Sequence, residues 1–245
     1  LNGGNKYQQF EGAFESKVIS KIAFQGFLHP PTKQWKAKLS ATNAQLSSGL
    51  IKLLPTDMQD QMKELRAVSG KINLKVEAQG LATLEEIPQI QIDAQVEQLT
   101  IDDNRLPFPI QNGSFDFQSS NAQGNEFLSI KNASARFGEA QFKCDYWHRG
   151  FILAPEQCKL NGRLDNFNFS NQERLIKWFP EYCTKFCDEY SPSGTSDIAF
   201  ELEYDGSSLK RSINADLTDM SFSFIKLPYA VANCRGNVTL TNDKW

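Results

Sequence analysis

The stretch "GKINLKVE", residues 70–77, decides the fold of this chain. Apolar side chains stand at Ile72, Leu74 and Val76, with a polar or charged residue between each of them. Successive side chains of a β-strand point to opposite faces of its sheet, so this segment predicts a strand with one apolar and one wet face. Antiparallel sheets commonly have this division, and we expect one here.

The same alternation recurs along the chain, in "QIQIDAQVE" (residues 89–97), "DIAFELEY" (197–204) and "SINADL" (212–217). It therefore predicts a mainly β fold with one continuous apolar side. By strand parity, the residues expected on that side are Ile72, Leu74, Val76, Ile90, Ile92, Val96, Phe115, Phe117, Ile198, Phe200, Leu202, Ile213, Leu217, Val238 and Leu240.

The first half of the sequence also resembles the second half. Pro55 and Pro180, Gly70 and Gly194, and further proline and glycine landmarks recur at nearly the same spacing. A fixed period predicts repeated structural units. We expect two tandem repeats, residues 1–123 and 124–245, joined near residues 121–125 into one elongated sheet.

Each predicted repeat places a short amphipathic helix between strands, at about residues 48–68 and about 171–189. In the second repeat, Ser170 and Glu173 have the spacing of a capping box at a helix start. In the first, Met58, Met62 and Leu65 lie three to four residues apart, the spacing of one helical face.

Composition excludes several classes of function. The 245 residues are 40% hydrophobic and 22% charged, with a net charge of −3, which predicts a globular chain and no nucleic-acid partner. No apolar run approaches the ~20 residues needed for a membrane-spanning helix. The first ten residues lack the features of a signal peptide, so we expect the chain to be an excised part of a longer protein.

The residues needed for catalysis are sparse. Only His29 and His148 are available as histidine bases, and neither lies near a recognisable nucleophile or metal-binding motif. The five cysteines fit no zinc spacing. We therefore expect a protein that is not an enzyme and uses no cofactor.

Four segments carry a resemblance to a known family. They are "LLPTDMQDQMKELRAVSGKINLKVEAQG" (residues 53–80), "WFPEYCTKFCDEYSPSGTSDIAFELEYDG" (178–206), "LPFPIQNGSFDF" (106–117) and "LPYAVANCRGNVTL" (227–240). In this order of helix, proline, glycine and strands, nearly the whole chain resembles the AsmA-like family of the AsmA, TamB and YhdP type. That family is similar to the eukaryotic bridge-like lipid transfer proteins.

The resemblance implies a curved, groove-like antiparallel sheet whose apolar side shields acyl chains of phospholipids. It also implies a location in the periplasm or cell envelope, a role in lipid transport and outer-membrane assembly, and membrane attachment through parts of the full-length protein outside this sequence. The parity residues given above are then the expected lining of the lipid groove.

Another reading of the same pattern is a β-sandwich for binding or adhesion, directed at carbohydrate. In that arrangement the alternating apolar residues form a closed core, and Trp147 or Trp178 stacks on a sugar. A third reading is an enzyme with paired carboxylates. The first two readings differ in whether the apolar side chains pack against one another or face an opening.

Overall fold

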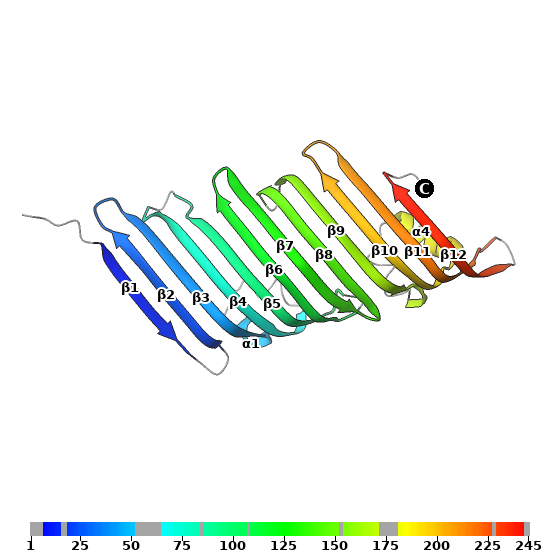
Figure 1. Ribbon diagram of the computed structural model, residues 1–245, viewed down its shortest axis with the longest axis horizontal. Helices are drawn as coiled ribbons and strands as arrows, with labels where there is room; N and C mark the ends of the chain where they lie inside the picture. Colours follow the sequence, from blue (N-terminus) through cyan, green and yellow to red (C-terminus); the bar gives the residue numbers. More distant parts are fainter. Residues whose placement is uncertain are drawn as a thin grey trace, which may run out of the picture.

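The computed structural model describes residues 7–15, 19–51, 65–83, 86–106, 108–151, 154–171, 181–226 and 229–242. Its strands form one antiparallel sheet of twelve strands, and the spatial order follows the chain from β1 to β12 (Figure 1). The strands are β1 (Gln8–Phe14), β2 (Ile19–His29), β3 (Gln34–Ser47), β4 (Leu65–Leu81), β5 (Gln89–Asp103), β6 (Ile110–Ala122), β7 (Asn125–Phe137), β8 (Ala140–Phe151), β9 (Ala154–Asn168), β10 (Ser193–Tyr204), β11 (Leu209–Ser223) and β12 (Ala230–Thr241).

The expectation of a mainly β, antiparallel fold is confirmed. Every described strand pairs only with its neighbours in the chain, so the sheet is a meander. The sheet of described strands is not closed, because within it β1 pairs only with β2 and β12 only with β11. The described strands form no second sheet, which removes the closed core expected for a sandwich.

Helices contribute much less than predicted. The described helical segments are α1 (Ser48–Ile51), the 3-10 turn η1 (Phe169–Asn171) and α4 (Glu181–Tyr190). The predicted helix at about 48–68 is wrong at its end, because Leu65 and Val68 belong to β4 and pair with Asp103 and Ile101. Ladder pairing with β5 outweighs the helical spacing there. Residues 52–64 and 172–180 of the two predicted helices lie outside the described residues.

The predicted join between the two repeats, residues 121–125, coincides with the turn between β6 and β7. Six described strands precede this turn and six follow it, and α1 and α4 each come after the third strand of their half. The tandem repeat itself stays a prediction.

Bulges interrupt the ladders at a recurring type of residue. Asn43, Asn132 and Asn166 have φ angles of 50°, 54° and 57°, and the register shifts by one residue at each of them. Asparagine tolerates this left-handed conformation better than most residues. Gln98, Asn112 and Asn233 adopt it too, in β5, β6 and β12. A bulge adds one residue to a strand and bends it, and the strands are visibly bent near their lower ends in Figure 1.

A small hydrophobic cluster lies where β7, β8 and β9 meet. Ala140 and Phe167 form a buried pair, against which Phe108, Phe137 and Leu164 pack. At the C-terminal side, α4 contacts β11, and Tyr190 of α4 stacks on Phe224 with ring centroids 4.9 Å apart. These clusters occupy only a small part of the sheet.

A single sheet leaves an unusually large surface. The chain has an accessible surface of 16583 Å² at 27.7 kDa. A compact monomer of this mass is expected to have about 11,000 Å². The excess is what an open, one-layer sheet produces.

Candidate functional site

One row of paired residues defines the apolar side of the sheet. Ala41 of β3 pairs with Leu74 of β4, Leu74 with Ala94 of β5, and Ala94 with Phe117 of β6. Residues directly opposite each other in an antiparallel ladder project to the same face. We call the side that carries this row the apolar face, and the other side the polar face.

The same row continues across the join between the two halves. Phe117 pairs with Ile130 of β7, followed by Tyr146 of β8, Leu160 of β9 and Leu202 of β10. The apolar face therefore runs without interruption from the first half of the chain into the second.

The register places all the residues selected by strand parity on this face. The pairs that position the remaining ones are Ile72–Val96, Val96–Phe115, Val76–Ile92, Ala78–Ile90, Phe200–Ile213, Ile213–Leu240, Ala215–Val238 and Ser196–Leu217.

Most of these side chains are half-buried. Val96 and Leu240 are 4% exposed, Val238 is 38% exposed, and all the others have intermediate exposure. Residues in the core of a two-layer protein would be largely inaccessible. The apolar face of this sheet thus remains accessible over most of its width.

Strand parity missed the first strands, where the face is most open. Phe10, Phe24 and Leu39 lie on it and are 49%, 43% and 36% exposed. Gly12 and Gly26 interrupt the alternation of apolar residues in β1 and β2. In both strands a phenylalanine stands two residues from a glycine, on the same face. This spacing could have identified the strands from the sequence.

The glycines of this face have a packing role. Gly12 pairs with Phe24, Gly26 with Phe10, and Gly162 with Phe200. In each pair the aromatic ring occupies the space that a side chain on the glycine would need. The rings therefore lie flat over the neighbouring strand, and the surface of the apolar face is smoother as a result.

Two polar side chains interrupt the apolar face on β8. His148 is 2% exposed, and its Nδ1 lies 3.1 Å from the hydroxyl of Tyr146. Burial lowers the pKa of His148, opposed by a hydrogen bond to the backbone of Gly150. Burial also raises the pKa of Tyr146. Both groups are therefore held in their neutral forms within the apolar wall.

The polar face carries several ion pairs. Glu77 accepts a hydrogen bond from Lys38 Nζ at 2.9 Å, and Lys75 and Lys36 lie 3.3 and 3.5 Å from its carboxylate. The bond from Lys38, with the contribution of Lys75, lowers the pKa of Glu77 to about 2. This carboxylate is ionised at neutral pH and marks the side of the sheet that faces water.

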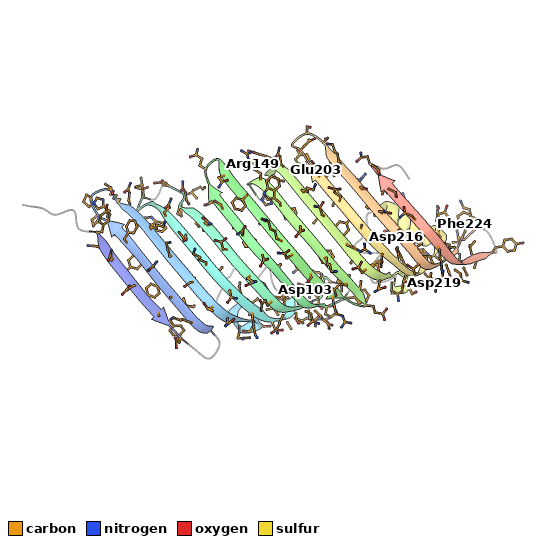
Figure 2. The ribbon with its side chains drawn as sticks, viewed as in Figure 1. Asp103, Arg149, Glu203, Asp216, Asp219 and Phe224 are labelled. Atoms are coloured by element: carbon orange, nitrogen blue, oxygen red, sulfur yellow. The ribbon has the colours of Figure 1, made fainter. Side chains whose placement is uncertain are left out.

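Charged residues also lie at the margins of the sheet. Figure 2 shows Asp103 at the lower margin and Arg149 and Glu203 at the upper one. Asp103 is fixed by Arg105, whose Nη2 lies 2.6 Å from Oδ2, and this bond lowers the pKa of Asp103 to about 2. The apolar face is therefore bordered by charge.

No group of three or more His, Cys, Asp or Glu among the described residues is arranged to hold a metal ion. None of the helices in the described part of the chain has the length and apolar character to cross a membrane. Cys144, Cys158 and Cys234 form no disulfide bond with another described residue. Trp147 lies on the polar face, and Trp178 lies outside the described residues.

Comparison with known proteins adds no relative: no family model, no curated protein and no solved structure matches this chain.

Proposed function

We propose that this chain is a non-enzymatic segment of a lipid conduit, whose apolar face holds the acyl chains of phospholipids. The observation that carries the proposal is the continuous row from Ala41 to Leu202, in which every side chain from Leu74 onward keeps intermediate exposure. An apolar surface of this extent on a soluble protein marks a binding site for an apolar partner.

The energetics favour an acyl ligand. Burying hydrocarbon contributes about 0.8 kcal/mol per CH2 group. A long acyl chain that buries about half of its surface on the sheet would thus gain several kcal/mol, enough for binding without a specific headgroup contact. The pKa of His148 is lowered and that of Tyr146 is raised, so neither adds charge to the wall at neutral pH.

The arrangement of the strands supports the conduit more than a closed pocket. Both outer strands have an unpaired edge in the described sheet, so the apolar face has no end wall at β1 or β12. The envelope location, the role in outer-membrane assembly and the resemblance to the AsmA-like family belong to this proposal. Membrane attachment would come from other parts of the full-length protein.

The proposal is tested with the 245-residue chain and a fluorescent fatty acid. We expect saturable binding, displacement by phospholipid, and co-purified phospholipid in native mass spectra. Phe117→Glu places a charge in the centre of the row and should abolish binding. Gln118→Glu adds the same charge on the neighbouring residue, which faces the polar side, and should leave binding intact. Absence of binding by the unmodified chain, or equal loss in both variants, would contradict the proposal.

A further inference from the structure

The polar face carries a trough that lipid binding would not use. A cavity of about 660 Å³ extends along this face from β3 to β7. Its floor is the strand backbone at Ala41, Leu74, Ala94 and Phe117, whose side chains project to the apolar face. The trough and the candidate lipid surface are therefore separated by the thickness of the sheet.

The first wall of the trough is a cross-strand row in which each residue pairs with the next. It consists of Ser40, Lys75, Asp93, Gln118 and Ser129. The row ends at Trp147 of β8, the ladder partner of Ser129. Trp147 is 40% exposed, so its indole is accessible where the wall ends.

The second wall runs parallel to the first, two residues further along each strand. It consists of Thr42, Asn73, Gln95, Asp116 and Lys131. Asp93 and Gln118 of the first wall bond to each other at 3.0 Å, and Asp116 accepts a bond from Asn132 at 2.8 Å. Hydrogen bonds thus hold carboxylate groups of both walls in place.

The lining has a defined chemical character. Lys75 and Lys131 balance the charges of Asp93 and Asp116, so the two walls together carry no net charge. Ser129 is only 4% exposed, and its hydroxyl has no hydrogen-bond partner among the described residues. An unpartnered buried hydroxyl is costly, and such groups in native proteins call for an explanation such as a bound water or ligand.

These features select a class of ligand. A polyphosphate or nucleic acid would need an excess of cations, and an apolar ligand would leave the polar walls unpaired. A neutral polyhydroxylated ligand matches balanced charge, two rows of amide and carboxylate groups, and one accessible indole. We propose that the trough binds an oligosaccharide, with Trp147 stacking on the apolar face of one sugar ring. The volume lies within the range of about 300–1,000 Å³ usual for ligand sites.

The test titrates the 245-residue chain with cellohexaose, maltohexaose and chitohexaose, using calorimetry and tryptophan fluorescence. We expect at least one of them to bind with a Kd below about 1 mM. Trp147→Ala should weaken that binding at least about tenfold, the equivalent of ~1.4 kcal/mol. The matched control is Trp35→Ala, because Trp35 pairs with Leu28 and Gly80 on the apolar face. This control should keep the affinity of the unmodified chain.

Several outcomes would overturn this inference. They are no binding of any of the three sugars, equal affinity of Trp147→Ala and the unmodified chain, or affinity that falls steeply with added salt, since that indicates a charged ligand. If Trp147→Ala does not fold, Trp147→Phe replaces it, and it should retain part of the binding. The fatty-acid assay is independent, because the two sites lie on opposite faces. Loss of one activity therefore leaves the other interpretable.

Discussion

Asp145 of β8 holds the bulge of the neighbouring strand: its Oδ1 accepts a hydrogen bond from the backbone amide of Asn132, 2.7 Å away. Asn132 has a φ of 54° and lies where the register between β7 and β8 shifts. The same arrangement recurs twice. Asn73 accepts from the amide of Asn43 at 2.9 Å, and Asp197 accepts from the amide of Asn166 at 2.8 Å.

Asp145→Ala is expected to destabilise the sheet. It removes the acceptor of the Asn132 amide, and a hydrogen bond of this kind contributes about 1 kcal/mol to the free energy of unfolding. Asp145→Asn keeps an acceptor oxygen at the same position and should lose less than half of that. Urea unfolding, compared at the transition midpoint, measures both. Equal stability of Asp145→Ala and the unmodified chain would show that the bond has no structural role.

Gly162→Ala is expected to destabilise the chain by about 1–3 kcal/mol, the usual effect of overpacking. The added methyl group would occupy the space of the Phe200 ring. Gly80→Ala is the matched control, because the nearest atom to a methyl group there is Pro88 Cα at an ordinary 3.4 Å. Combining Gly162→Ala with Phe200→Leu should restore part of the loss. If the two glycine substitutions have equal effects in thermal unfolding, the ring does not depend on Gly162.

Glu77 is expected to make the protein sensitive to acid. Its folded pKa is about 2, below the ordinary value of 4.5, because of the hydrogen bond from Lys38. The stabilising contribution of its ionised form is therefore complete above pH 4.5 and declines as the pH falls toward 2. The difference in melting temperature between the unmodified chain and Glu77→Gln, measured across that window, should shrink with falling pH. A difference that does not vary with pH would contradict the ion-pair cluster.

His148 is expected to add a second pH dependence near neutrality. Its folded pKa is lowered by burial, so the unfolded chain takes up a proton first as the pH falls. The stability associated with neutral His148 is therefore complete above its ordinary value of 6.5 and declines below that pH. His148→Gln should flatten this slope in unfolding experiments between pH 7.5 and 5.5. An unchanged slope in the variant would assign the dependence to other groups.

Strand alternation predicted much of the fold because it reports directly on backbone geometry. The segments around Leu74, Ile92, Phe200 and Ile213 are strands of one sheet, as their period of two indicates. The extra residue of each bulge was not recognised. The sequence signal of a bulge is a pair of apolar residues separated by two residues instead of one, the second of them an asparagine. Examples are "IKNA" at residues 130–133 and "LDNF" at 164–167.

What depends on pairing between strands could not be predicted. Helical spacing suggested that the segment through Val68 is a helix, but its partners in β5 hold it in the sheet. The trough is a further case, because Ser40, Asp93 and Ser129 share a wall only through the register of five strands. No single segment of the sequence carries a signal for it.

The meander order gives this protein a modular length. Because each described strand forms its ladder only with the preceding and following ones, the sheet is close to one-dimensional in its energetics. Removing or duplicating a hairpin such as β7 with β8 would leave the remaining strands with the correct direction and the same side chains facing each way. Evolution can therefore lengthen or shorten such a ribbon by whole hairpins, whereas an odd number of strands would reverse the direction of every strand beyond it.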